Sequence, residues 1–535
     1  MVILMSNPYS YETPYAVTKV PVHARNMVAA SQPLATQAGL RMLLQGGNAI
    51  DAALATAITL TVVEPTGNGV GSDAFAIVWD GKQLHGLNAS GRSPQAWSPE
   101  RFAGLDEMPQ RGWESVTVPG AVSAWITLSE RFGKLPFTDL FEPAISYARN
   151  GFEVSPIIAA LWQRGAKALG NQPGFAEGFM RDGKTPAAGE TFVNAPLART
   201  LQLIAETKGE AFNRGELAQK IAAFAKEHGA ALTTADLSAH KSDWCGTIAM
   251  RFRDVQLHEI PPNGQGIAAL MALGILEKTD IDKHGPDSVA AIHLQIEAVK
   301  LALADVERYV AELPSMRIRI DALLDPVYLA GRAKLIDMNA AIDSKAGAPT
   351  GGGTVYLATA DASGMMVSYI QSNYGGFGSG VVVPGTGIHL QNRGMGFTLE
   401  PGHPNRVGPG KRPFHTIIPG FLMKDGEPLM SFGVMGGPMQ AQGHVQMLLR
   451  TQVFGQNPQA ASDAPRWRFI SGKKVAVEWS MDEALVSGLQ ALGHEISRET
   501  RDDNFGFGGA QLISRLGEGY IGGSDHRKDG TAAGY

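Results

Sequence analysis

Three consecutive glycines, Gly351 to Gly353, stand directly before Thr354, and that threonine opens the strand-like run VYLATA. Glycine has no Cβ and adopts backbone conformations that other residues reach only with strain. A strand that is entered through such a segment places its first hydroxyl beside a peptide bond that can be distorted. We therefore expect the start of this strand, at Thr354, to have a role beyond that of an ordinary strand residue.

A threonine hydroxyl becomes a nucleophile when a nearby base takes its proton, and one solution uses the threonine's own α-amine. This amine has a reference pKa of about 7.7–8.0, so it can accept a proton near neutral pH. To free it, the hydroxyl would attack the carbonyl of Gly353, and the resulting ester would hydrolyse. The alternative is a flexible loop that enters a strand, and this stretch alone favours that alternative because glycine-rich turns are common.

Patterns elsewhere in the 535 residues predict helices and strand hairpins in alternating blocks. Apolar residues at helical spacing predict two helices within residues 31–65 and another at 441–455. Short polar turns predict hairpins around residues 80–81, 361–364 and 425–426. With 44% hydrophobic residues the chain can bury a large core, and we expect an α+β fold of sheets covered by helix layers.

Composition disfavours several classes of function. The net charge of −5 offers no basic surface for nucleic acid or an anionic membrane. No apolar run reaches the roughly 18 residues of a membrane span, and the N-terminal MVILMSNPYSYETPYAV lacks the pattern of a secretory signal. The single cysteine, Cys245, excludes an internal disulfide and a multi-cysteine metal site. We expect a cytoplasmic protein with a small-molecule partner and with no metal or cofactor.

Common catalytic motifs do not account for the chain. The glycine loop at residues 67–71 would bind a phosphate only between a strand and a helix, but here the order is helix, loop, strand, which predicts a structural turn. The G-x-S-x-G, H-E-x-x-H and G-x-x-x-x-G-K signatures do not occur, and the histidines lack metal-ligand spacing. A metal enzyme or an ordinary serine hydrolase is therefore disfavoured.

Two further segments could supply groups that a threonine nucleophile needs. Gly436 and Gly437 fall between a predicted strand and a predicted helix, where backbone N–H groups can hold an oxyanion. A plain strand-to-helix turn explains them equally well. Arg92 lies in a turn where a guanidinium could hold a carboxylate with two hydrogen bonds, although most loop arginines are only solvated.

Together these segments resemble the gamma-glutamyltransferase family of N-terminal nucleophile hydrolases. The matching motifs follow the family's order along almost the whole chain: MVAASQPLATQAGLRMLLQGGNAIDAALA, VVEPTGNGVGSDAF, VTVPGAVSAW, PPNGQGI, VGPGKRPFHTIIPGF, MGGPMQ, DAPRW and GGSDHRKDGTAAGY. The resemblance implies a four-layer αββα sandwich made from a precursor that cleaves itself between Gly353 and Thr354. Residues 1–353 would form the large subunit and residues 354–535 the small one, and a dimer of such pairs is one possible assembly.

The match also implies roles for single residues. Thr354 would be the nucleophile, Gly436 and Gly437 the oxyanion pair, and Arg92 the ligand of the substrate's α-carboxylate. Ser372 falls on a hydroxyl residue that supports the nucleophile, where threonine is usual.

The departures from the family pattern concern the substrate. Members that use glutathione have an acidic residue for the substrate's amino group, where this chain has Gly396, and Arg393 replaces a glutamine. His415 and Thr416 replace paired serines, and Tyr374 replaces an asparagine that contacts substrate. A pocket with two arginines and no carboxylate would disfavour an ammonium group and favour an anion.

We therefore expect hydrolysis of a small carboxylate-bearing amide. The pattern resembles the branch of the family that contains oxamate amidohydrolase, an enzyme of purine and allantoin breakdown that releases ammonia. Two alternatives remain open: a γ-glutamyl hydrolase or transferase, or an acylase for a β-lactam side chain. A further alternative is a non-catalytic relative that never matures and serves as a binding or scaffold protein.

Overall fold

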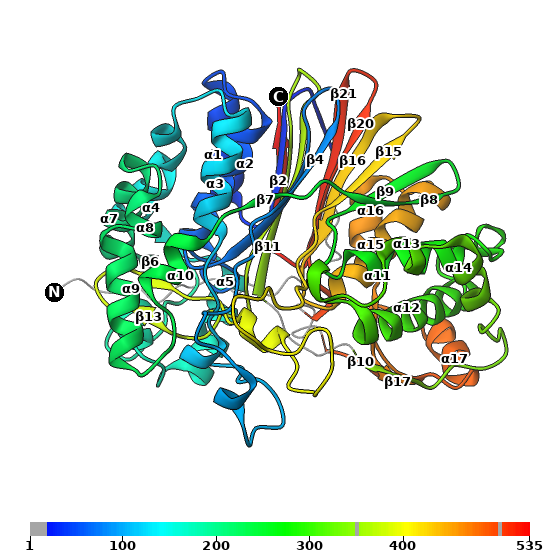
Figure 1. The fold of residues 1–535 in the computed structure, drawn as a ribbon. Helices are drawn as coiled ribbons and strands as arrows, with labels where there is room; N and C mark the ends of the chain where they lie inside the picture. The colour runs from blue at the N-terminus through cyan, green and yellow to red at the C-terminus, as the bar shows by residue number, and fades with distance from the viewer. Residues whose placement is uncertain (1–18, 348–352, 501–505) are drawn as a thin grey trace.

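The computed structural model describes residues 19–347, 353–500 and 506–535. Two seven-stranded sheets lie face to face in the middle of the molecule, and helices cover the outer face of each (Figure 1). This is the α+β layering that the sequence patterns predict, in the αββα form that the family resemblance implies. Residues 1–17, which bear on the expected absence of a signal, and Gly351 and Gly352 lie outside the described residues.

The first sheet contains Thr354 in an interior strand, β11. In spatial order its strands are β22 (Thr531–Gly534), β2 (Met27–Ala30), β11 (Gly353–Ala360), β12 (Met366–Tyr374), β3 (Asp73–Trp79), β4 (Leu84–Asn88) and β7 (Asp243–Trp244), each antiparallel to its neighbours. The predicted hairpins at residues 80–81 and 361–364 are the β3–β4 and β11–β12 pairs.

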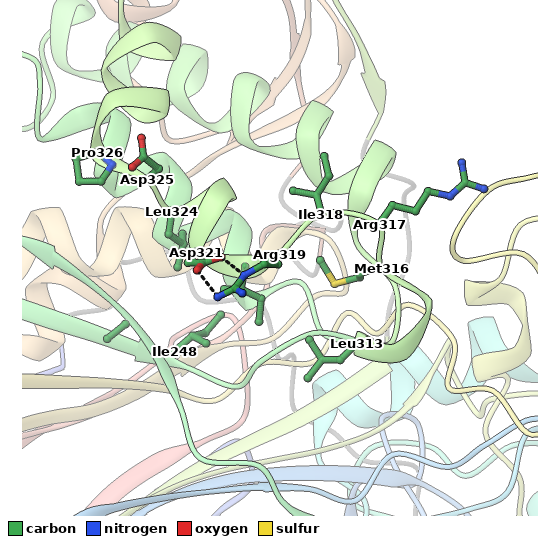
Figure 2. Close-up of a pocket in the computed structure, with 12 residues that line it drawn as sticks. Ile248, Leu313, Met316, Arg317, Ile318, Arg319, Asp321, Leu324, Asp325 and Pro326 are labelled. Carbon is green, nitrogen blue, oxygen red and sulfur yellow. Dashed lines mark hydrogen bonds and ion pairs between the residues drawn. The ribbon is translucent and has the colours of Figure 1, made fainter.

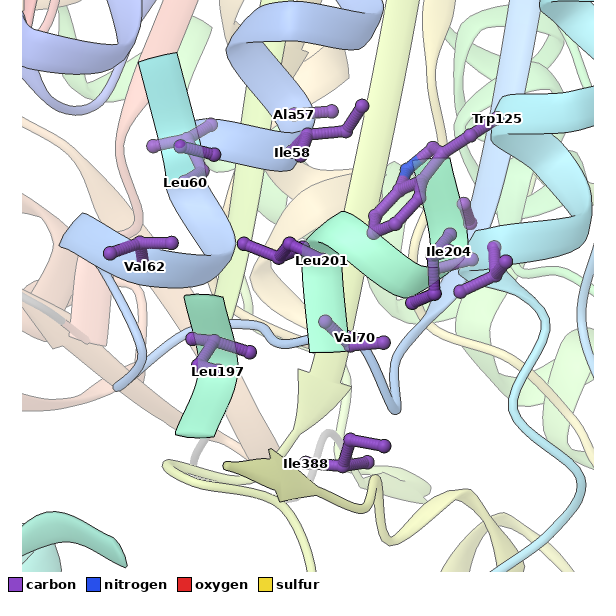
Figure 3. Packing of buried hydrophobic residues seen from close by; sticks show 14 of the residues in the cluster. Ala57, Ile58, Leu60, Val62, Val70, Trp125, Leu197, Leu201, Ile204 and Ile388 are labelled. Atoms are coloured by element: carbon purple, nitrogen blue, oxygen red, sulfur yellow. The ribbon is translucent and has the colours of Figure 1, made fainter. Parts of the chain in front are cut away.

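Helices rich in alanine and leucine cover this sheet. Those that contact its strands are α1 (Pro33–Leu44), α2 (Ala49–Val63) and α3 (Ala121–Phe132). The same hydrophobic core also includes α4 (Glu142–Asn150), α5 (Pro156–Leu169), α7 (Ala195–Glu206) and α9 (Glu216–Glu227). Both helices predicted in residues 31–65 are confirmed. Asn48 caps α2 by accepting the N–H groups of Ile50 and Asp51, and the Asp51 side chain accepts the N–H of Asn48 in return. Figure 3 shows part of the hydrophobic core that these helices form, with Leu60 of α2, Trp125 of α3 and Leu201 of α7.

The second sheet and its helices form the other half of the molecule. In spatial order its strands are β1 (Val22–Ala24), β21 (Gly519–Ser524), β20 (Ala510–Leu516), β16 (Glu427–Val434), β15 (Gly420–Lys424), β9 (Val255–Glu259) and β8 (Ile248–Phe252). Its outer face is covered by α11 (Gly266–Leu276), α12 (Val289–Tyr309), α15 (Met439–Leu448) and α16 (Pro458–Asp463). The helix predicted at 441–455 is α15, which begins at Met439 and continues as a π-helix over Leu449–Val453.

A smaller sheet of β10 (Ser344–Gly347), β17 (Trp467–Gly472), β18 (Lys474–Val477) and β19 (Glu495–Arg498) lies beside α12 and α17 (Glu483–Ala491). No helix in the described ranges combines the length and apolar character that a membrane crossing needs.

Strand periodicity decides which way the Thr354 side chain points. Val355 and Leu357 belong to the core under the helices, whereas Tyr356 and Ala358 belong to the core between the sheets. Because side chains alternate along a strand, Thr354 shares the inner side with Tyr356. The same alternation in β12, where Ile370 lies in the inner core, puts Ser372 on that side as well.

Candidate active site

The hydroxyl of Thr354 meets that of Ser372 on the neighbouring strand. The two residues are cross-strand partners, and their Oγ atoms are 3.0 Å apart. Ser372 Oγ also donates a hydrogen bond of 2.7 Å to the carbonyl oxygen of Gly353. Because Ser372 has one hydroxyl proton and gives it to that carbonyl, Thr354 is the donor to Ser372. Ser372 therefore contacts both the predicted nucleophile and the carbonyl that it would attack.

The backbone around Gly353 is closely packed. An added Cβ on Gly353 would lie 2.7 Å from the carbonyl oxygen of Thr66, and one on Gly67 would lie 3.2 Å from that of Thr354. The 67–71 loop thus lies between α2 and β3, in the predicted order of helix, loop and strand, and it also packs against the strand of the nucleophile. Sequence reasoning missed this second role, and the loop's high glycine content was its only signal.

A buried guanidinium lies directly beside Ser372. Arg393 donates hydrogen bonds to Ser372 Oγ (2.6 Å) and Thr416 Oγ1 (2.8 Å), and it packs against the ring of Tyr374 at 4.6 Å. It is only 1% exposed, its Nε–H has no acceptor, and no carboxylate in the described ranges lies within ion-pairing distance. Burial lowers the pKa of Arg393 to about 10, against the opposing effects of Asp73 and Tyr374. The site therefore holds a buried cation, Arg393, whose Nε–H remains available as a hydrogen-bond donor.

Tyr374 is held in an unusual backbone conformation. Its φ is +76°, in the left-handed region, which non-glycine residues occupy at a cost of about 1–3 kcal/mol. Strain of this kind concentrates at functional sites. The predicted substrate contacts Tyr374, Arg393 and Thr416 are therefore adjacent to one another and to Ser372.

His415 is joined to Asp73 rather than to the residues around Tyr374. Its Nε2 lies 3.1 Å from Asp73 Oδ2, and its Nδ1 accepts the N–H of Ile417. Burial, with Arg393 and Arg412, holds the pKa of His415 well below its usual value. The ring is therefore neutral with its proton on Nε2, which donates to Asp73. A direct substrate contact by His415 stays a prediction.

Asp73 is a residue that sequence reasoning did not single out. Its Oδ1 accepts the backbone N–H groups of Gly91 and Gly120, and burial raises its pKa to about 7, against the opposing effects of Arg393 and these donors. It lies in the motif VVEPTGNGVGSDAF, but the motif did not reveal its role, because its partners come from distant segments.

Gly436 and Gly437 form the turn between β16 and α15. Their φ values are +113° and +59°, which suit glycine, and neither N–H donates to an acceptor within the described residues. Gln265, which sequence reasoning also missed, donates to the carbonyl oxygens of Gly437 and Thr416 and so ties this turn to the neighbourhood of Arg393. Both N–H groups are available to hold an oxyanion.

A pocket of about 320 Å³ opens beside this group, with Gln265, Tyr374, Gly396, Thr416 and Pro438 in its wall. An added Cβ on Gly396 would lie 2.4 Å from the carbonyl oxygen of Phe414. An acidic side chain at this position would require a backbone shift.

Arg92 lies outside this group, so the structure does not bring the two predicted arginines together. Its side chain is 45% exposed and forms an ion pair of 3.0 Å with Glu312. It lines a separate pocket of about 450 Å³ with His240, Lys241 and Arg412. Contact of Arg92 with a substrate carboxylate stays a prediction.

A more open pocket of about 730 Å³ lies along residues 313–326 (Figure 2). Its Arg319 and Asp321 are 85% and 65% exposed and pair with each other, and no residue of the group around Thr354 lines it. It is a surface depression with no catalytic groups.

One cluster in the described ranges, His293, Glu297 and His494, has donor atoms close enough to hold a metal ion. Lys300 donates to the Glu297 carboxylate at 2.8 Å, and His293 Nδ1 lies 2.8 Å from His494 Nε2. An ammonium group on the carboxylate and a proton between the imidazoles make this a hydrogen-bonded network, which does not fit a cation.

The four-layer sandwich has a threonine hydroxyl at the start of a buried interior strand, and in the described ranges two backbone N–H groups of the β16–α15 turn have no acceptor. These features define an N-terminal nucleophile hydrolase, an enzyme that acts on amides. The family model described as gamma-glutamyltranspeptidase matches residues 35–535, and the chain belongs to that family.

Named relatives span the full chain. The glutathione hydrolase-like YwrD proenzyme of Bacillus subtilis is 36% identical, over 97% of this chain and 100% of its own. The oxamate amidohydrolase proenzyme of Klebsiella pneumoniae is 33% identical, over 96% and 99%. The crystal structure of cephalosporin acylase from Bacillus halodurans superposes with a TM-score of 0.94 at 46% identity and covers 99% of both chains.

Proposed function

We propose that this protein is a self-cleaving N-terminal threonine amidohydrolase whose substrate bears a carboxylate next to the scissile carbonyl, as oxamate does. Arg393 is the observation that carries the proposal, because it is a buried cation without an anionic partner. Such a cation is costly in a protein interior, and a bound carboxylate would supply both the missing charge and acceptors for its free donors.

The distance between Arg393 and the nucleophile supports a carboxylate in the α position. Two successive hydrogen bonds, of 2.6 and 3.0 Å, connect Arg393 Nη2 through Ser372 Oγ to Thr354 Oγ1. A carboxylate bonded directly to the scissile carbon can reach Arg393 while that carbon stays near Thr354. In a γ-glutamyl group, three carbons separate the carboxylate from the scissile carbonyl, so the same contact is harder to make.

Maturation would begin with attack of Thr354 Oγ1 on the carbonyl carbon of Gly353. The bond to the Thr354 nitrogen breaks, an ester forms on the hydroxyl, and water hydrolyses it to leave the Gly353 carboxylate and a free α-amine. The hydrogen bond from Ser372 Oγ to the Gly353 carbonyl supports this step, because it becomes stronger as negative charge develops on that oxygen.

In turnover the free amine takes the proton of Thr354 Oγ1 while the oxygen attacks the substrate amide. The N–H groups of Gly436 and Gly437 hold the oxyanion, and the C–N bond breaks as the leaving amine takes the proton. Water then hydrolyses the acyl ester. The names of the relatives, which include an oxamate amidohydrolase, a glutathione hydrolase-like protein and an acylase, support an amide substrate in general.

The test combines protein mass with substrate choice. The wild type should give two fragments under denaturing conditions, the smaller beginning at Thr354. Thr354→Ala should remain a single chain without activity, whereas Thr354→Ser should retain part of both reactions because it keeps the hydroxyl. The matured enzyme should release ammonia from oxamate faster than it cleaves a γ-glutamyl anilide. The reverse preference would overturn the proposed substrate, and an active Thr354→Ala would overturn the nucleophile.

A matched pair of variants tests which of the two arginines binds the substrate carboxylate. Arg393→Lys keeps the charge but loses the planar array of donors, so KM for oxamate should rise at least tenfold. Arg92→Lys should raise KM less, because Arg92 is half-exposed and already paired with Glu312. A larger rise in KM for Arg92→Lys than for Arg393→Lys would indicate that Arg92 is the residue that binds the substrate carboxylate.

A further inference from the structure

Asp73 lies close enough to Arg393 for their charges to interact, but the two side chains form no ion pair. Asp73 and Ser372 are direct cross-strand partners on β3 and β12. Phe75 and Ile77 lie in the core between the sheets, so strand alternation puts Asp73 on the same inner side as Ser372. The Asp73 carboxyl is therefore next to the hydroxyl to which Arg393 donates a hydrogen bond.

Three hydrogen bonds direct the Asp73 carboxyl to other partners. Oδ1 accepts the backbone N–H groups of Gly91 and Gly120, each at 3.1 Å. Oδ2 accepts Nε2–H of His415, also at 3.1 Å. The side chains of Asp73 and His415 are both fully buried, so no solvent takes the place of a lost donor. His415 is thus the donor that occupies the second oxygen.

His415 and Thr416, adjacent in sequence, bind the two charged groups separately. Thr416 Oγ1 accepts a hydrogen bond of 2.8 Å from Arg393, and the His415 ring donates to Asp73. One short segment therefore binds the cation at one residue and the acid at the next.

The His415 ring is itself held in place. It packs edge-on against Phe75, with ring centroids 4.8 Å apart. Its backbone N–H donates to the carbonyl oxygen of Asn263, and its own carbonyl accepts the N–H of Gln265, both at 2.9 Å. These contacts fix the position from which Nε2 donates to Asp73.

A second guanidinium, that of Arg412, also acts on the charge of Asp73. It is bound elsewhere, because its Nη1 donates to Asp243 and its Nε donates to the carbonyl oxygen of Ser90. Arg393, by contrast, has an Nε–H without an acceptor. A buried carboxylate that loses a donor is stabilised by pairing with a cation, and Arg393 is the cation with a donor available.

We propose that His415 is a positioning residue that keeps Asp73 from pairing with Arg393 and so leaves the guanidinium free for the substrate carboxylate. This inference rests on the proposed function. The serine that the family pattern has at this position is shorter than histidine and would leave Asp73 Oδ2 without its donor. His415 therefore acts on substrate preference through Asp73 rather than by touching the substrate.

The test is a double-mutant cycle on KM for oxamate at pH 8, where Asp73, with a pKa of about 7, is mostly ionised. His415→Ser should raise KM about ten- to a hundredfold, the range expected for a hydrogen bond to a charged group. In an Asp73→Asn background the same replacement should change KM by less than about threefold, because no carboxylate remains to occupy Arg393. An equal rise in both backgrounds would overturn the inference, since His415 would then act without Asp73.

His415→Gln is the matched variant. Its side-chain amide can donate to Asp73 in place of Nε2–H, so KM should remain close to the wild-type value. KM does not depend on the fraction of enzyme that folds and matures, so a lower yield of a variant does not alter the comparison. A rise of about tenfold or more in His415→Gln would also overturn the inference.

The proposed function and the inference fail in different ways. An active wild type together with an unchanged KM in His415→Ser would overturn the inference and leave the proposed function intact. A matured wild-type enzyme that does not hydrolyse oxamate would overturn the proposed function, and the inference with it.

Discussion

At Gly396 the backbone passes so close to Phe414 that the family's acidic side chain has no room. An added Cβ would lie 2.4 Å from the Phe414 carbonyl oxygen, so the backbone would have to move. The backbone path at Gly396 therefore leaves no room for a side chain that could bind an ammonium group.

Gly396→Asp should not restore hydrolysis of γ-glutamyl compounds. Overpacking of this kind costs about 1–3 kcal/mol, so the variant should have a lower Tm and no gain in activity with a γ-glutamyl anilide. Gly285→Asp is the control, because no atom lies within 4 Å of the added Cβ, and it should keep its Tm. A Gly396→Asp enzyme with normal Tm and new γ-glutamyl activity would show that the site does accommodate the acid.

Asp73 is an acid whose charge changes near neutral pH. Burial raises its pKa to about 7, and it lies close enough to Arg393 for the two charges to interact. When Asp73 ionises, it partly neutralises the cation that would bind an anionic substrate. KM for oxamate should therefore rise between pH 6 and pH 8, and kinetics across that range in Asp73→Asn should lose most of this rise. The same slope in both proteins would exclude Asp73 as its cause.

The raised pKa of Asp73 also makes the stability of the folded protein depend on pH. The folded protein binds the Asp73 proton more tightly than the unfolded chain, in which the carboxyl has its ordinary pKa of 3.8. The contribution of Asp73 to stability is therefore fully present below about pH 4 and declines as the pH rises through 7.

At the scale of elements, a buried ion network joins the C-terminal motif GGSDHRKDG to β17 and β18. Asp525 pairs with Arg466 and Arg527, and Arg527 pairs with Glu478, all of them 2% exposed or less at the side chain. Burial would raise the pKa of Asp525, but the two arginines outweigh burial and hold it well below its usual range. The network explains structurally why the DAPRW and GGSDHRKDG motifs occur in one chain.

Arg466→Met should destabilise the protein by about 3–5 kcal/mol, because it removes one partner from a buried carboxylate. Arg319→Met is the control, since its pair with Asp321 is exposed, and it should leave the Tm nearly unchanged. Thermal unfolding of both in the uncleaved Thr354→Ala background measures the difference. Because the pKa of Asp525 is lowered, its stabilisation is present above about pH 4 and is lost as the pH falls further. Equal Tm values for the two variants would contradict the network's importance.

At the scale of the whole molecule, a break before Thr354 would leave each sheet built from both fragments. In the first sheet β11, β12 and β22 come after the break and β2, β3, β4 and β7 before it; in the second, β15, β16, β20 and β21 come after and β1, β8 and β9 before. In each sheet, strands of one fragment are hydrogen-bonded to strands of the other, as in the β2–β11, β12–β3, β1–β21 and β15–β9 pairs, so the fragments cannot separate without disrupting both sheets.

The cleaved protein should therefore remain one particle under native conditions and unfold in a single thermal transition. Size exclusion with mass detection should give the sum of the fragment masses, whereas denaturing conditions should give the two fragments. Uncleaved Thr354→Ala serves as the control for size. Separation of the fragments in native buffer, or two transitions of which one belongs to each fragment, would contradict this interleaved architecture.

The sequence by itself determined the layered α+β fold, the helices at residues 31–65, the three hairpins and the family, because strand alternation, helical spacing and turn chemistry are local properties. It also pointed to Thr354, Ser372, Arg393, Tyr374 and Thr416, which the structure brings together. Only the tertiary structure decided the rest. It pairs Arg92 with Glu312, 220 residues away, and places Arg92 in the wall of a different pocket from the one beside Tyr374 and Thr416. It adds Asp73 and Gln265, whose contacts arise from segments that meet only when the two sheets pack. Local patterns specify elements, whereas a buried charge takes its role from distant neighbours that the chain brings to it.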